Sequence, residues 1–105
     1  MEHVAIIDGQ HHTVDAIEPV PGLRVYKHPH RDYGIGTYPV CLGHHEGRHI
    51  ARTECTADAI DAARDLAEMA DWTQPETEIQ AAPGLAEKVA DYFAGHNAIW
   101  AGGYR

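Results

Sequence analysis

A β-hairpin that leads into a helix is predicted by residues 37–71, which read TYPVCLGHHEGRHIARTECTADAIDAARDLAEMAD. Two segments of strand character, Thr37–Gly43 and Arg48–Glu54, flank the dipeptide Glu46-Gly47. Glycine readily adopts the left-handed conformation that a short hairpin connection requires. The segment therefore predicts two antiparallel strands joined by a tight turn.

The helix is expected from Ala57 to Asp71. Thr56 is a suitable N-cap, because its hydroxyl can accept a hydrogen bond from an amide of the first turn. Apolar residues recur at spacings of three and four, the pattern of a helix with one buried face. They are Ala59, Ile60, Ala63, Leu66, Ala67, Met69 and Ala70, while Asp58, Asp61, Arg64, Asp65 and Glu68 cover the other face.

Further strands and a second helix are predicted on either side of this stretch. His3–Ile7 and His11–Ile17 flank Asp8-Gly9, a dipeptide that favours a tight hairpin turn. Leu23–His28 alternates apolar and polar residues, as a half-buried strand does. Residues 83–95 begin with proline, end with glycine and carry apolar residues at helical spacing, which predicts a helix.

These elements predict an α+β fold. We expect an antiparallel sheet, made of the N-terminal hairpin, a strand and the second hairpin, with two helices packed on one face. A chain of 105 residues has the length for one core. We therefore expect residues 1–95 to form a single compact domain around a core module, residues 23–72. Residues 96–105 are expected to be a C-terminal tail, unless Trp100 and Tyr104 dock on the domain.

Charge divides the chain into two parts. Residues 1–53 hold six Asp/Glu against five Lys/Arg, and they contain eight of the nine histidines. Residues 54–91 hold ten Asp/Glu against only Arg64 and Lys88, and the whole chain has a formal net charge of -8. This acidity opposes non-specific phosphate binding by the molecule as a whole.

Neither a membrane span nor a secretory signal is predicted. The longest apolar runs, such as Val4–Ile7, are far shorter than the roughly 20 residues that cross a bilayer. The N-terminus also lacks the basic segment and the apolar core of a secretory signal. We expect a cytoplasmic protein without membrane partners, in which Cys41 and Cys55 stay reduced.

Zinc-binding residue types are concentrated in the second hairpin: Cys41, His44, His45, His49 and Cys55. If Glu46-Gly47 is the turn, residues whose numbers sum to 93 pair across the strands. His44 then lies opposite His49, while Cys41 points to the other face. A closed four-ligand site is awkward in this register, so we expect no cofactor. Zinc bound by His44, His45 and His49 remains the alternative.

A catalytic signature is missing from the sequence. No local motif marks Cys41 or Cys55 as a nucleophile. Gly34-Ile35-Gly36 lacks the further glycine and the helix start of a phosphate-binding loop. The sequence therefore favours a protein without enzymatic activity.

The sheet face turned away from the helix is expected to be cationic and aromatic. The hairpin register places Val40, Leu42 and Ala51 toward the helix, and Cys41, His45, Arg48, Ile50 and Arg52 on the other side. Arginine and aromatic residues often anchor recognition surfaces. The predicted partner-binding residues are Arg24, Tyr26, His28, Tyr38, Arg48 and Arg52, with Arg31 and Tyr33 nearby.

The strand Ile50–Thr53 runs into an alanine-containing helix that starts at Thr56–Ala59. In this respect residues 23–72 resemble the three-stranded-sheet-plus-helix modules of AP2-like and integrase amino-terminal DNA-binding domains. Those modules are basic, whereas this helix is acidic, so the resemblance implies a topology more than an activity. The segment is also similar to short uncharacterised proteins of GC-rich bacteria and their phages, which end in an Asp-Trp-Thr like Asp71–Thr73.

Three functional hypotheses follow from the sequence. The leading one is a small non-enzymatic accessory or modulator protein, phage or mobile-element encoded, that binds a macromolecular partner, foremost another protein. The first alternative is a nucleic-acid-binding module that uses the Arg/Tyr/His face of the sheet. The second alternative is a zinc-binding module built on residues 41–49. A homodimer through sheet edges or Trp100 is left open.

Overall fold

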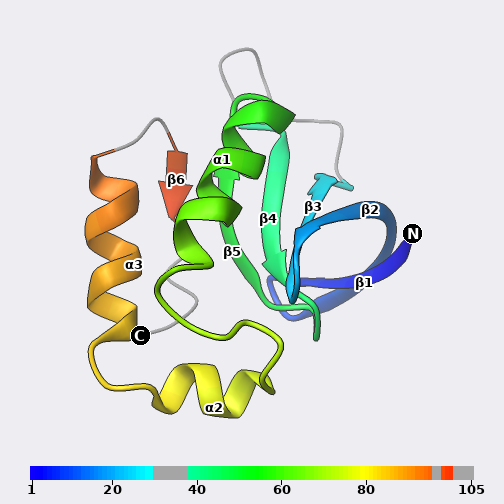
Figure 1. The fold of residues 1–105 in the computed structure, drawn as a ribbon. Helices are drawn as coiled ribbons and strands as arrows, with labels where there is room; N and C mark the ends of the chain where they lie inside the picture. The colour runs from blue at the N-terminus through cyan, green and yellow to red at the C-terminus, as the bar shows by residue number, and fades with distance from the viewer. Residues whose placement is uncertain (30–37, 96–97, 101–105) are drawn as a thin grey trace.

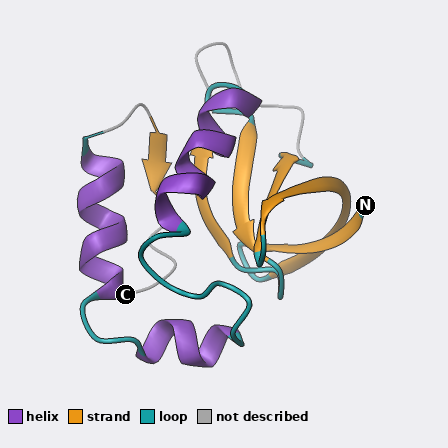
Figure 2. Cartoon of the chain, viewed as in Figure 1, coloured by secondary structure: helices purple, strands orange, loops and turns teal. Residues whose placement is uncertain are grey.

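Six strands and three helices form the described part of the chain, residues 1–29, 38–95 and 98–100, in the computed structural model (Figures 1 and 2). The strands are β1 (Glu2–Ile7), β2 (Gln10–Val20), β3 (Leu23–Lys27), β4 (Val40–His44), β5 (His49–Thr53) and β6 (Ala98–Trp100). The helices are α1 (Thr56–Leu66), α2 (Glu76–Ala81) and α3 (Leu85–Ala94). The predicted α+β fold with an antiparallel sheet is confirmed.

The strands form one sheet in which sequence neighbours are also neighbours in space, from β1 to β6. The long β2 pairs twice, because its first part lies against β1 and its second part, from Ala16 onward, lies against β3. A register shift between Ile17 and Val20 interrupts the second pairing. The Ile6 amide donates a hydrogen bond of 2.7 Å to the Gly47 carbonyl. The sheet therefore curls until β1 reaches the turn between β4 and β5.

The main core lies between the sheet and the helices. The sheet contributes Leu23, Val25, Val40, Leu42, Ile50 and Ala51, and α1 and α3 contribute Ala59, Ala62, Ala63, Leu66, Leu85, Val89 and Phe93. The spacing of the helical residues is that of the predicted amphipathic faces. Val40, Leu42 and Ala51 face the helix as expected.

The helices differ from the prediction in number and bounds. The helix expected over 57–71 begins at Thr56 and ends at Leu66, and Cys55 rather than Thr56 takes the cap position, without a side-chain hydrogen bond. The buried Trp72 closes the end of α1, because its indole N–H donates to the Leu66 carbonyl at 2.7 Å. The helix expected over 83–95 is α3, and the short α2 is an additional element.

The second face of the sheet is covered, in contrast to the expectation of an open face. The hairpin of β1 and β2 folds over it and encloses a small second core of Ala5, Ile7, Ala16, Tyr26 and Cys41. Cys41 is fully buried, and Tyr26 is 3% exposed. The curl of the sheet therefore hides Tyr26, one of the positions that were expected to meet a partner.

Three residues near the C-terminus form a strand. Ala98–Trp100 is β6 and pairs antiparallel with β5, with Ala51 opposite Trp100. These three residues of the expected tail, for which docking of Trp100 was left open, therefore lie at the edge of the sheet. Tyr104 lies outside the described residues. Within the described ranges, no helix has the length and apolar character needed to cross a membrane.

Candidate functional site

The β4–β5 hairpin follows the predicted register only near its base. Val40 pairs with Thr53, and Leu42 pairs with Ala51, as expected. The register then shifts by one residue, so that His49 lies opposite Gly43 rather than opposite His44. The shift turns Ile50 into the helix-side core, where it is fully buried. Both the predicted His44–His49 pair and the predicted outward position of Ile50 are wrong, because this irregularity changes the alternation of faces.

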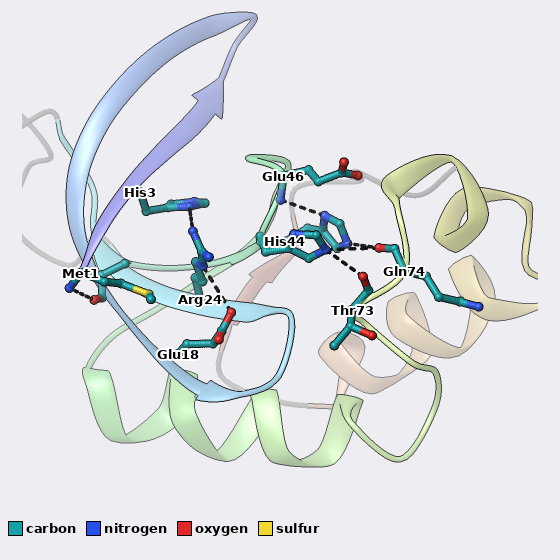
Figure 3. A network of polar contacts seen from close by, with 10 residues as sticks. Met1, His3, Glu18, Arg24, His44, Glu46, Thr73 and Gln74 are labelled. Atoms are coloured by element: carbon teal, nitrogen blue, oxygen red, sulfur yellow. Dashed lines mark hydrogen bonds and ion pairs between the residues drawn. The ribbon is translucent and has the colours of Figure 1, made fainter.

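His44 is a buried, fully hydrogen-bonded imidazole. Its Nδ1 accepts a hydrogen bond from the Glu46 amide at 3.1 Å. The proton must therefore be on Nε2, which donates to the Gln74 carbonyl at 2.9 Å (Figure 3). Burial lowers the pKa of His44, although the bond to Gln74 opposes this shift. Both ring nitrogens are committed to the backbone, so His44 cannot ligate a metal without breaking one of these bonds.

His45 joins the tip of the hairpin to the segment between α1 and α2. Its Nε2 lies 3.2 Å from the Thr73 carbonyl and 3.3 Å from the Gln74 carbonyl, so this nitrogen carries the proton and donates. The rings of His44 and His45 have centroids 4.2 Å apart. The adjacent histidines of the sequence therefore serve together as an anchor between the hairpin and the helices.

His49 makes different contacts from those of His44 and His45. The Nε2 of His49 donates a hydrogen bond to the Ala51 carbonyl at 3.1 Å. Burial lowers the pKa of His49. Its ring stands edge-on to that of His28, with centroids 6.3 Å apart. His44, His45 and His49 therefore do not converge on one point. Across the described ranges, no group of three or more His, Cys, Asp or Glu side chains is placed to hold a metal ion.

Arg24 lies in a polar network under the N-terminal hairpin. Its Nη1 donates to Nδ1 of His3 at 3.1 Å, and its Nε contacts the Glu18 carboxylate at 3.3 Å (Figure 3). Burial, followed by the positive charge of Arg24, lowers the pKa of His3 to about 4. The sequence did not single out His3 for this role, because its position in a short apolar run gave no sign of an arginine partner.

The other predicted partner-binding residues are distributed between the interior and the margin of the sheet. Tyr26 packs against the His3 ring at 5.2 Å between centroids, and His28 is also buried. Tyr38 and Arg52 are half-buried. Arg48 makes an ion pair with Glu76 of α2. Arg31 and Tyr33 lie outside the described residues.

Cys41 and Cys55 occupy opposite environments. Cys41 is buried in the second core, and burial raises the pKa of its thiol to about 12. Cys55 is exposed just before α1. The two thiols are thus not part of one constellation with the histidines of the hairpin.

Six exposed carboxylates lie on or beside α1 and α3. We call their surface the acidic helical face, and it consists of Asp58, Asp61, Asp65 and Glu68 on or just after α1 and Glu87 and Asp91 on α3, all exposed. Tyr92 of α3 donates a hydrogen bond of 2.7 Å to the Asp65 carboxylate, which links the two helices. Arg64 and Lys88 are the two cations in this part of the sequence.

A groove of about 430 Å³ lies where β2 separates from β3 beside the start of α1. Its apolar lining includes Val14, Ile17 and Val25, and Asp15, Lys27 and Thr56 add polar groups. Ile17 is 48% exposed at this groove. Sequence alternation could not locate this groove, because it results from the bend of β2.

Comparisons with known proteins assign this arrangement to no family. No family model matches the chain, and neither a curated protein nor a solved structure matches it.

Proposed function

We propose that this is a small non-enzymatic accessory protein whose acidic helical face binds a basic surface of a protein partner. The observation that carries the proposal is the charge of this face, because six carboxylates are exposed on, or just after, two linked helices. Complementary potentials steer association and select partners. A surface of this kind can occupy the basic site of a nucleic-acid-binding protein, a role suited to a modulator encoded by a phage or mobile element.

The state of the arginines supports this choice over direct nucleic-acid binding. Arg24 contacts Glu18 and His3, and Arg48 pairs with Glu76. Tyr26, which would have stacked on a base, is covered by the N-terminal hairpin. Nucleic-acid affinity requires cations that displace condensed counterions from phosphates. Arg24 and Arg48 therefore already contact acidic or imidazole groups of the same chain.

The test compares two doubly neutralised variants in affinity capture from the native host at low salt. Asp61→Asn/Glu68→Gln removes two charges from the acidic helical face, and Glu2→Gln/Asp8→Asn removes two exposed charges from the N-terminal hairpin. We expect the unmodified chain and the hairpin variant to retain the same basic protein. The helix variant should lose most of it, and increasing salt should release it from all three proteins.

Two results would contradict the proposal. One is equal capture by the helix and hairpin variants, which would show that the acidic helical face does not select the partner. The other is retention of the purified protein on a DNA duplex or single strand at about 50 mM salt with a steep salt dependence, which would favour the nucleic-acid-binding alternative.

A further inference from the structure

The N-terminal hairpin, which consists of β1 and the first part of β2, joins the rest of the sheet at a bend. β2 pairs with β1 as far as Asp15, and from Ala16 onward it pairs with β3. The second pairing contains a register shift between Ile17 and Val20, an irregularity at which a strand bends. The hairpin can therefore move about residues 16–20 without breaking the pairing of β3, β4 and β5.

Small side chains make up much of the apolar contact between this hairpin and the sheet. The second core consists of Ala5, Ile7, Ala16, Tyr26 and Cys41, with the half-buried Val14 packed beside it. Two of the four residues that the hairpin contributes are alanines, which bury little apolar surface. The closure of the hairpin therefore depends also on polar contacts, the backbone bond from Ile6 to Gly47 and the bond between His3 and Arg24.

His3 lies between the hairpin and β3 and is only 2% exposed. Its ring packs on that of Tyr26, and its Nδ1 accepts the hydrogen bond from Arg24 at 3.1 Å (Figure 3). Arginine can only donate, so the proton of the neutral ring is on Nε2. This Nε2 is buried and has no hydrogen-bond partner within the described ranges. Opening the hairpin would let the Nε2 N–H bond to water, which favours the open form.

A second proton on the His3 ring is incompatible with the closed hairpin. The proton would occupy Nδ1 and point at the N–H groups of Arg24. The hydrogen bond would then be replaced by the contact of two donors and of two positive charges.

The remaining charged and titratable groups around His3 do not remove this conflict. They are Glu18 of β2, His44 at the end of β4, and His45 next to it. The two imidazoles oppose a proton on His3, and Glu18 favours it. The Glu18 carboxylate, however, already lies 3.3 Å from Nε of Arg24. Within the hairpin itself, the Met1 amino group and the Asp15 carboxylate pair with each other.

We propose that the N-terminal hairpin is an acid-released cover: protonation of His3 breaks its bond to Arg24, and the hairpin opens while the main core stays folded. The buried residues of the main core come from β3, β4, β5, the helices and Trp72, so this core does not require β1. Opening uncovers Tyr26 and Cys41. Arg52 pairs with Cys41 across the strands and lies on the same face. Acid therefore exposes the cationic and aromatic sheet face that the closed hairpin covers.

The pH range follows from the two states of His3. Its pKa is about 4 in the closed hairpin, and an exposed imidazole has a pKa of about 6.5. The open form binds more protons between these values, so the open fraction rises as the pH falls through this range. For one imidazole with these two pKa values, the ratio of open to closed molecules rises about twentyfold from pH 7 to pH 5.

Thiol labelling of Cys41 measures the opening. In a Cys55→Ser background, the rate with an aromatic disulfide reagent is divided by the rate for the urea-unfolded chain at the same pH. We expect this normalised rate to rise about twentyfold from pH 7 to pH 5. His3→Gln can still accept from Arg24 but takes up no proton, so it should abolish most of the rise. His11→Gln, which removes an exposed imidazole of the same hairpin, should keep the full rise.

A second variant and a urea series complete the test. Arg24→Gln keeps a donor for Nδ1 of His3 without the positive charge, so the rise should be smaller than in the unmodified chain. Opening of the hairpin alone exposes little surface, so labelling at pH 5 should have less than half the urea dependence of equilibrium unfolding. The proposal fails if the two urea dependences agree, because Cys41 would then react through global unfolding. It also fails if the normalised rate does not change with pH, or if His3→Gln keeps the full rise.

Discussion

Buried imidazoles decide how this protein responds to acid. In the fold, His3 takes up a proton only near pH 4, because it is buried and beside the Arg24 guanidinium. In the unfolded chain the same side chain takes up a proton near pH 6.5. The unfolded chain therefore binds more protons between these values, and the free energy of unfolding falls as the pH drops through this window. His44 and His49, whose pKa values are also lowered by burial, act in the same direction.

Replacement of His3 should reduce this sensitivity to acid. His3→Gln keeps an oxygen that can accept from Arg24 but cannot take up a proton. Between pH 7 and pH 4, we expect the variant to lose less of its free energy of unfolding than the unmodified chain, by on the order of 2 kcal/mol. Urea titrations at several pH values measure the difference. The matched control is His11→Gln, which removes an exposed imidazole, and equal pH dependence of both variants would contradict the role of His3.

The turn between β2 and β3 shows how one glycine positions two elements. Gly22 has φ of +88°, and a Cβ built on it would lie far inside contact distance of the Trp72 carbonyl. The His45 amide also donates to the Gly22 carbonyl at 2.9 Å. This turn therefore lies where the hairpin tip and the segment after α1 meet, and a side chain there would separate them.

A pair of glycine variants distinguishes the close approach from backbone strain. Gly84 before α3 also has a left-handed φ, of +73°, but a Cβ there would have nothing within 4 Å. Gly84→Ala should cost only the conformational penalty, roughly 1–2 kcal/mol. Gly22→Ala should cost at least about 3 kcal/mol, because the backbone of Trp72 must also move. Denaturant midpoints measure both costs, and similar values would mean that the Trp72 segment yields easily.

Strands β1 to β5 and the two longer helices could be predicted because their residues repeat with the period of the structure they form. The buried faces of α1 and α3 follow from this repetition, and the pairing of Val40 with Thr53 follows from the position of the Glu46-Gly47 turn. The register shift near Ile50 could not be predicted, since Arg48 and His49 are polar in either register. The burial of Tyr26 could not be predicted either, because the hairpin that covers its side chain contributes small residues such as Ala5 and Ala16. A candidate site that depends on which sheet face is open therefore needs the three-dimensional structure.

The molecule as a whole is closed by the contact between β1 and the β4–β5 turn. Besides the hydrogen bond from Ile6 to Gly47, a Cβ on Gly47 would lie 2.8 Å from the Val4 carbonyl. Cys41 lies in the second core, which the β1–β2 hairpin covers. Reagents therefore reach its thiol when the β1–β2 hairpin opens. The labelling rate of Cys41 therefore reports the opening of the curled sheet.

Weakening this closure should accelerate thiol labelling. In a Cys55→Ser background, we expect Gly47→Ala to raise the reaction rate of Cys41 with an aromatic disulfide reagent about tenfold, which corresponds to a local loss of about 1.4 kcal/mol. Gly84→Ala is the control, because its position is remote from the hairpin. Equal rates in the two variants would show that Cys41 becomes accessible by another motion.

The consecutive order of the strands also has a consequence for how the chain folds. From β1 to β5, each strand pairs with the one made just before it, so the sheet can grow by one hairpin at a time as the chain leaves the ribosome. Within the sheet, two contacts join segments that are far apart in the sequence, the bond from Ile6 to Gly47 and the pairing of β6 with β5. We expect these two closures to be the last steps in forming the sheet, because their loops are the longest that the strand pairing closes.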